Sequence, residues 1–197
     1  MSARAGDNQA DHRAQERADQ RDMADALNPA SSSERLRQLA RHESPTIRAR
    51  LVTNPSLPED VRVALARDRV PMVRLEVAVS GHSSTEIIDE LATDRLDPVR
   101  TKAARHPALS SQAALRLAAQ DPHREVRTTA LTQLSEQQVR DLIDQYALTA
   151  SPVVGEGLRE LVRRGVDMDS FLADQRGAVR SAVTQILTDS LTDQPPR

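Results

Sequence analysis

The sequence contains no cysteine and no tryptophan, and its aromatic side chains are limited to Tyr146 and Phe171. Without cysteine there are no disulfides, no thiolate-bound Fe–S clusters and no zinc–thiolate sites. With so few large rings, a core has to be built from Leu, Val, Ile and Ala side chains. Because small side chains permit close approach, this composition predicts short helices that are stacked closely together.

A long hydrophobic run and a strong net charge are also missing. No apolar segment approaches the roughly 18 residues that a membrane-spanning helix needs. The net charge is −2 at pH 7, so the chain as a whole has no general affinity for nucleic acid or for an anionic membrane. We therefore expect a soluble, cytoplasmic protein without a membrane partner.

The two ends of the chain differ from its middle. Residues 1–30 are rich in acids, arginine and alanine but almost lack branched apolar side chains. Ala10, Ala14 and Ala18 recur at four-residue spacing, which allows a marginal helix, but an alanine ridge buries too little surface to hold a fold, so a disordered tail is favoured. Residues 189–197, which end in TDQPPR, predict a second disordered tail. A single helical domain is expected between them, over residues 31–188.

A period of about 26 residues organises that domain. Four leucines follow one another at this spacing: Leu39, Leu65, Leu91 and Leu117. An aliphatic residue that precedes an arginine repeats in the same way, at Ile47, Val73, Val99, Val126 and Val179. Val154 occupies a further copy of this position, but no arginine follows it. A fixed period of this length is typical of stacked repeat units, about six of them here.

Each unit reads as two helices joined by turns. In LPEDVRVALARD, Pro58 and the acids Glu59 and Asp60 suit the first turn of a helix. The segment SEQQ, from Ser135 to Gln138, predicts a capping box. A shorter second helix follows a proline in most copies: Pro45, Pro71, Pro98, Pro122 and Pro152. No segment alternates with the period of a strand, so the predicted fold class is all-α.

The segment NPSLPEDVRVALARDRVPMVRLEVAVSGHSSTEIIDELATDRLDPVRTKAARHP carries a family pattern. Its Asn54-Pro55 and His106-Pro107 turns, its LA.D helix ends and its DP.VR step resemble tandem units of the leucine-rich repeat variant family, which are similar to HEAT and armadillo repeats. The resemblance covers about residues 31–188. It implies a right-handed α-solenoid and leaves open whether one helix of each pair is 3₁₀ or α. The founding type carries an Fe–S segment, which cannot apply to a chain without cysteine, so no cofactor is expected.

Aspartate and arginine recur six residues apart within the pattern, as the pairs Asp68–Arg74, Asp94–Arg100, Asp121–Arg127 and Asp174–Arg180. Stacking would bring the arginine of one unit beside the aspartate of its neighbour. Guanidinium groups suit carboxylates and the free carbonyls at helix ends. We therefore interpret these residues as a structural ladder. The alternative, a row of arginines for phosphates, is weaker because the adjacent acids would repel a phosphate.

Catalytic and metal-binding patterns are not apparent. The histidines His42, His82, His106 and His123 lie at different repeat positions and never four residues apart. Paired acids in first helical turns are explained by the helix dipole. No nucleophile and base form a recognisable set, and the glycines form no phosphate loop. The sequence predicts neither an enzyme nor a metal site.

The favoured function is a scaffold that binds another protein through a curved surface. The third position after each aliphatic anchor is expected to face outward, and Arg105 lies one turn further, which gives these candidate contact residues: Arg50, Glu76, Lys102, Arg105 and Thr129. The alternative is a nucleic-acid-binding solenoid that uses the arginines of the repeat helices. Residues 35–105 carry a surplus of only three basic side chains, whereas backbone binding neutralises about six to ten phosphates.

One copy departs from the others. Its second helix, SPVVGEGLREL, contains Gly155 and Gly157 and lacks the ladder arginine. An interior glycine costs about 1 kcal/mol relative to alanine. The sequence therefore predicts a weak position in the stack at this helix.

Overall fold

The computed structural model describes the backbone of residues 3–149 and 151–192 and the side chains of residues 13–149 and 151–189. Within these residues every helix is an α-helix and no strand is present, which confirms the all-α class. The helices are α1 (Ala3–Leu27), α2 (Ser33–Leu39), α3 (Pro45–Leu51), α4 (Glu59–Ala66), α5 (Pro71–Val79), α6 (Thr85–Leu91), α7 (Asp97–Arg105), α8 (Ser111–Gln120), α9 (Arg124–Leu131), α10 (Glu136–Tyr146), α11 (Pro152–Arg163), α12 (Asp169–Leu172) and α13 (Gly177–Thr192).

The chain forms two compact units, residues 1–108 and residues 109–197. The sequence, by contrast, suggested one domain over residues 31–188. In the described part of the chain, no helix combines the length and the hydropathy that a membrane span requires. The expected C-terminal tail begins inside α13, and residues 193–197 lie outside the described residues.

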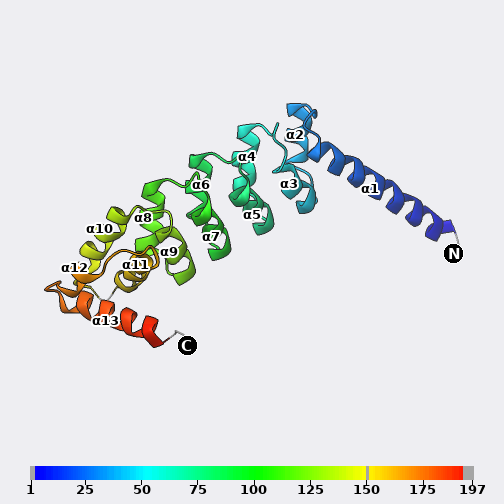
Figure 1. Cartoon of the computed structure of the whole chain (residues 1–197). Helices are drawn as coiled ribbons and strands as arrows, with labels where there is room; N and C mark the ends of the chain where they lie inside the picture. Colours follow the sequence, from blue (N-terminus) through cyan, green and yellow to red (C-terminus); the bar gives the residue numbers. More distant parts are fainter. Residues whose placement is uncertain (1–2, 150, 193–197) are drawn as a thin grey trace. The chain divides into compact units, whose positions relative to one another are not determined.

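The first unit contains two rows of helices. The first row consists of α2, α4 and α6, and the second row of α3, α5 and α7 (Figure 1). In the second row α5 packs against both α3 and α7, and in the first row α4 packs against α6. The leucines of the 26-residue period lie between the rows, where Leu39, Leu65 and Leu91 are each 1% exposed. The leucines that recur every 26 residues therefore form part of the core.

Proline and acidic residues define where the helices begin. Pro45 and Pro71 occupy the first turn of α3 and α5, where the missing N–H of proline removes no helical hydrogen bond. Glu59 and Asp60 lie in the first turn of α4, next to the positive end of the helix dipole. These local signals fix the starts of helices that are too short to be stable alone.

Helix α1 differs from the disordered tail expected over residues 1–30. Its C-terminal part packs against α2 and α3, with Ala26 fully buried. Arg35 of α2 binds the carboxylates of Asp22 and Asp25. The side-chain amide of Asn54 donates to the Ala26 carbonyl at 2.9 Å. The expectation failed because polar contacts and one small buried side chain anchor this helix, and neither leaves a hydrophobic signal in the sequence.

The second unit pairs α8 with α9 and α10 with α11, and α11 also packs against α9 and α13. The predicted capping box at the start of α10 is confirmed. Ser135 Oγ accepts from the Gln138 N–H at 3.2 Å, and Gln138 Oε1 accepts from the Ser135 N–H at 2.9 Å.

The glycines of α11 do not interrupt the helix, which is continuous over 12 residues. A Cβ atom placed on Gly157 would lie 3.1 Å from Ile143 Cγ1 of α10. That separation is tighter than ordinary packing allows. Gly157 therefore serves the close approach of α10 and α11, a role that the sequence did not indicate.

Candidate functional site

The first unit contains two arginine–carboxylate pairs of the same geometry. Arg48 binds Asp68 through Nε at 2.6 Å and Nη2 at 3.0 Å. Arg74 binds Asp94 through the same atoms at 2.6 and 2.9 Å. Each guanidinium meets its carboxylate with two parallel hydrogen bonds, the arrangement that makes this pairing both strong and directional. We call this series the arginine ladder.

The same arginines also bind a backbone carbonyl six residues earlier. Arg74 Nη1 donates to the Asp68 carbonyl at 2.9 Å. The equivalent bond is made by Arg100 to Asp94, by Arg127 to Asp121 and by Arg180 to Asp174. The six-residue spacing in the sequence therefore corresponds to a contact with the backbone of the aspartate. The carboxylates of Asp68 and Asp94 are bound by arginines 20 residues earlier in the chain.

The pair of Arg74 and Asp94 is nearly withdrawn from water, with side chains 7% and 8% exposed. Burial alone raises the pKa of Asp94, but hydrogen bonds from Arg74 and from the Leu96 N–H outweigh it. The pKa of Asp94 therefore lies below its ordinary value. The pKa of Asp68 is lowered through the same competition between burial and its hydrogen bonds from Arg48 and the Val70 N–H.

In the second unit the ladder uses a partner that the sequence did not reveal. Arg127 binds Glu156 of α11 through Nε at 2.8 Å and Nη2 at 2.7 Å. The ladder arginine is missing from α11, as expected, but α11 supplies a carboxylate, Glu156, 29 residues after Arg127. The irregular spacing and the adjacent glycines hid it. At the end of the series Asp174 is bound by Arg176, whose hydrogen bond lowers the pKa of Asp174 to about 2.

A pair of opposite arrangement lies at the N-terminal side of the ladder. Asp22 precedes Arg48 by 26 residues, and His42 precedes Asp68 by 26 residues. His42 Nε2 lies 3.2 Å from Asp22 Oδ2, and His42 Nδ1 accepts from the Ser44 N–H at 3.0 Å. At this position α1 supplies the acid Asp22, whereas α3 and α5 supply the arginines Arg48 and Arg74. Asp22 was missed because it lies in the segment expected to be disordered.

His106 is part of a second hydrogen-bond series, at the C-terminal ends of the second-row helices. Its Nε2 lies 3.0 Å from the Ser80 carbonyl, 26 residues earlier, and its Nδ1 accepts from the Ala108 N–H at 3.1 Å. Asn54 makes the matching contacts, with the Asn28 carbonyl and the Ser56 N–H, both at 2.9 Å. The imidazole therefore takes the place of an asparagine amide in a structural turn.

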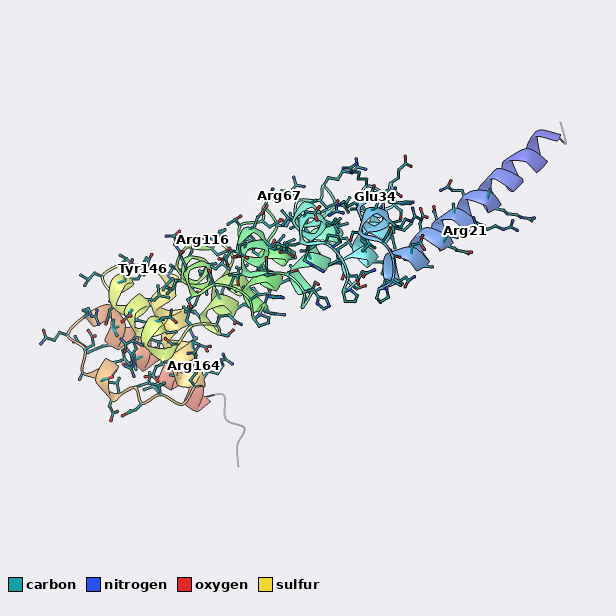
Figure 2. All side chains as sticks on the ribbon, turned by 90° about the horizontal axis from the view of Figure 1, so that it is seen from above. Arg21, Glu34, Arg67, Arg116, Tyr146 and Arg164 are labelled. Carbon is teal, nitrogen blue, oxygen red and sulfur yellow. The ribbon has the colours of Figure 1, made fainter. Side chains whose placement is uncertain are left out.

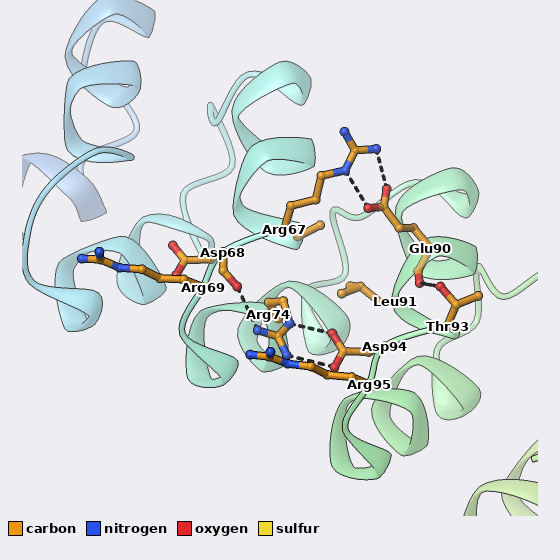
Figure 3. Close-up of a pocket in the computed structure, with 10 residues that line it drawn as sticks. Arg67, Asp68, Arg69, Arg74, Glu90, Leu91, Thr93, Asp94 and Arg95 are labelled. Atoms are coloured by element: carbon orange, nitrogen blue, oxygen red, sulfur yellow. Dashed lines mark hydrogen bonds and ion pairs between the residues drawn. The ribbon is translucent and has the colours of Figure 1, made fainter. Parts of the chain in front are cut away.

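A pocket of about 450 Å³ lies between the ends of α4 and α6 and the start of α5 (Figure 3). Arg67 closes one side by binding Glu90 at 2.6 and 2.9 Å, and Figure 2 shows Arg67 at the outer end of α4. The carboxylates that line the pocket, Asp68, Glu90 and Asp94, are each bound by an arginine. These carboxylates act as structural partners, and their pairing favours neither proton transfer nor metal binding. Among the described residues, no group of three or more His, Cys, Asp or Glu could hold a metal ion.

The predicted contact residues of the first unit lie on one face of the second row. Arg50 of α3, Glu76 of α5 and Lys102 of α7 follow one another at 26 residues. Arg50 and Lys102 are exposed, and Glu76 is half-buried. Arg105 is exposed one turn further along α7.

Thr129 does not behave as expected in the second unit. It was predicted to face outward, but it is buried, with 8% of its surface exposed. A threonine side chain is short and stays close to its own helix, and little of it reaches the surface here. Thr129 is therefore not a candidate contact residue.

Two apolar side chains that the sequence analysis missed lie beside Glu76. Met72 is 41% exposed and Val79 is 51% exposed, both on α5. They are seven residues apart, two turns of the same helix, so they lie on one side of it. We call Arg50, Met72, Glu76, Val79 and Lys102 together the α3–α5–α7 face. A pattern of exposed positions 26 residues apart could have identified Met72 and Val79.

Comparison with protein-family models, with curated proteins and with solved structures finds no match to the chain.

Proposed function

We propose that the protein is a non-catalytic scaffold that binds another protein through the α3–α5–α7 face. In this proposal the chain is a right-handed α-solenoid of about six 26-residue units, of the kind that the leucine-rich repeat variant family forms. The observation that carries the proposal is the exposure of Met72 and Val79, at 41% and 51%, between the basic side chains of Arg50 and Lys102. Apolar side chains with a charged border are typical of surfaces that contact proteins.

The arginine ladder supports a scaffold rather than a binding site of its own. Arg48 and Arg74 are each 5% exposed, and each holds a carboxylate of the following 26-residue repeat. Bonds of this kind fix how one repeat packs on the next, and they leave the outer face of the second row available. A stacked array of short helices presents a long surface on which contact residues vary while the framework stays constant.

A nucleic-acid-binding solenoid is less well supported. Its contacts would come from the arginines of the repeat helices, but Arg48 and Arg74 are buried and bound to carboxylates. Single-stranded nucleic acid usually stacks on aromatic side chains. Tyr146 and Phe171 are the only aromatic residues, and Phe171 is buried beneath Arg140. The protein-binding function therefore agrees better with the charges and the exposed residues.

An affinity purification of the full chain tests this proposal. The variant Met72→Thr/Val79→Thr carries at both positions the threonine found 26 residues earlier, Thr46 in α3 and Thr53 just after it. It should fold normally and lose the proteins that the wild type retains after nuclease treatment. The control Gln38→Ala/Ala64→Ser changes exposed positions of the first row and should retain them. Equal retention by both variants, or retention that nuclease abolishes, would contradict the proposal.

A further inference from the structure

We propose, on the basis of the function above, that the α3–α5–α7 face binds an acidic protein segment with an apolar centre. The segment would cross the three helices, with its apolar side chains on α5 and its carboxylates on α3 and α7. The geometry points to this partner through three observations: where the apolar side chains are exposed, where the cations are unpaired, and how far apart the cations lie.

The apolar surface is confined to α5. Met72 and Val79 are exposed there, and Leu75 between them is half-buried. The residues equivalent to Met72 are Thr46 in α3 and Pro98 in α7, and those equivalent to Val79 are Thr53, just after α3, and Arg105 in α7. The three helices pack in the same row, so Thr46, Thr53 and Arg105 indicate that the fold accepts a polar side chain at each of these two positions. The apolar side chains of α5 are therefore not explained by packing within the unit.

The cations beside this apolar surface have no partner in the described part of the chain. The side chains of Arg50 and Lys102 make no hydrogen bond or ion pair to a described residue. Five other arginines of the first unit behave differently: Arg35, Arg37, Arg48, Arg67 and Arg74 each bind a carboxylate. The two uncompensated charges on the outer helices of the face favour a segment with acidic residues at both ends.

Glu76 selects against acid in the middle of the segment. It lies four residues from Met72 and three from Val79, on the same side of α5. A carboxylate placed over α5 would be repelled by Glu76, whereas apolar or amide side chains would not. Across the face, α3 is therefore positively charged, α5 is apolar with one acidic residue, and α7 is positively charged.

The spacing of the helices sets the spacing of the acids in the partner. Packed helices lie about 8–10 Å apart, so α3 and α7 are separated by roughly 16–20 Å across α5. An extended segment covers this distance in about five or six residues at about 3.3 Å per residue. A helical segment needs about 11–13 residues at about 1.5 Å per residue. Two lengths of probe can distinguish these forms.

The probes are fluorescently labelled peptides, and binding to the full chain is followed by fluorescence anisotropy. The two acidic probes carry two glutamates at each end and two leucines at the centre, with the glutamate pairs about six or about 12 residues apart. One control peptide replaces glutamate by lysine, and another replaces leucine by serine. A single-stranded oligonucleotide provides a polyanion without an apolar centre. We expect one acidic probe to bind at least about tenfold more tightly than all three controls.

Paired variants test whether binding occurs at this face. Met72→Thr/Val79→Thr should weaken the acidic probe about tenfold or more, because it removes the apolar contact. Arg50→Ser/Lys102→Ser should weaken it several-fold at low salt and less at high salt. The control Gln38→Glu/Ala64→Glu makes the same change in net charge on α2 and α4, and it should leave binding unchanged. Circular dichroism of each variant establishes that the fold is retained.

Several results would overturn the inference. One is equal binding of the glutamate and lysine peptides, and another is tighter binding of the oligonucleotide. A third is equal weakening by the variant on α2 and α4. Concentration-dependent dimerisation that Met72→Thr/Val79→Thr abolishes would instead identify a second copy as the occupant. If the affinity purification retains a protein at this face while the acidic probes fail, only the partner class is wrong. If neither experiment shows dependence on the face, the proposed function fails as well.

Discussion

Arg74 holds the carboxylate of Asp94, 20 residues further along the chain, with Nε and Nη2 at 2.6 and 2.9 Å. Its remaining Nη1 group donates to the Asp68 carbonyl at 2.9 Å. One guanidinium therefore joins the turn before its own helix to the corresponding turn of the next pair of helices. Because Arg48 makes the same contacts one pair earlier, this bond repeats along the first unit.

Removing one partner of this pair should destabilise the fold. Asp94→Ala leaves the Arg74 guanidinium and the Leu96 N–H without their acceptor in a nearly buried site. We expect a loss of about 2–4 kcal/mol in the free energy of unfolding, near or below the range for a desolvated pair because some solvent contact remains. Thermal and urea unfolding measure it. Arg50→Ala, which removes an exposed and unpaired cation, should change the stability by less than about 0.5 kcal/mol. Equal stability of the two variants would contradict a structural role for the ladder.

The ladder should also make the stability of the fold depend on pH. The folded-state pKa of Asp94 and Asp68 is lowered, so their contribution is complete above the unfolded value of about 3.9. It is lost as the pH falls below that value and through the folded pKa. We expect urea midpoints to be level between pH 5 and pH 7 and to fall below about pH 4. Asp94→Asn should be less stable at pH 7 and should lose less on acidification than the wild type. A parallel fall in both proteins would assign the acid sensitivity to other groups.

His106 should be replaceable by asparagine but not by leucine. Asparagine makes the same two kinds of hydrogen bond at Asn54, so His106→Asn can preserve the contacts with the Ser80 carbonyl and the Ala108 N–H. His106→Leu leaves two buried polar groups unsatisfied, which costs about 1–3 kcal/mol. Chemical unfolding of both variants at pH 7 should separate them by at least about 1 kcal/mol. Similar stability of both variants would mean that the turn relies on packing alone.

The C-terminal part of α1 should contribute to stability. Deleting residues 1–27 removes the buried Ala26, the acids that bind Arg35 and the carbonyl that binds Asn54. We expect the melting temperature to fall by several degrees, since about 1 kcal/mol corresponds to about 2–4 °C in a chain of this size. Calorimetry of the truncated chain measures the change. The point variant Arg21→Ala, at an exposed position of the same helix, is the matched control and should melt like the wild type. An unchanged melting temperature after truncation would restore the expectation of a dispensable tail.

The two glycines of α11 should respond in opposite ways to alanine. A Cβ on Gly155 meets only the end of the flexible Arg159 side chain, at 3.4 Å. Gly155→Ala should therefore gain up to about 1 kcal/mol from helix propensity. Gly157→Ala places a methyl group 3.1 Å from Ile143 Cγ1, and the strain should cancel or exceed that gain. Urea unfolding of the two variants measures the difference. Equal stabilisation by both would show that α10 can move aside and that Gly157 has no packing role.

The α3–α5–α7 face shows what a repeat pattern can and cannot indicate. Its period located Arg50, Glu76 and Lys102 on equivalent positions, and the structure places them on one face of α3, α5 and α7. The same rule failed at Thr129, which is 8% exposed, whereas the longer side chains of Arg50 and Lys102 are exposed. A periodic rule gives the equivalent position in each copy but not the length of the side chain there, and both decide what is exposed.

The sequence by itself determined the helical class, the starts of many helices and the leucines of the core. These features depend on residues within one or two turns of each other, so local periodicity and capping contain them. Only the tertiary structure decided that α1 is anchored, that Glu156 binds Arg127 and that Gly157 allows α10 and α11 to approach. Each of these depends on residues that are distant in the sequence and at irregular spacing. The free energy comes from hydrogen bonds and close packing formed after the helices meet, and no local pattern encodes which side chains will then be in contact.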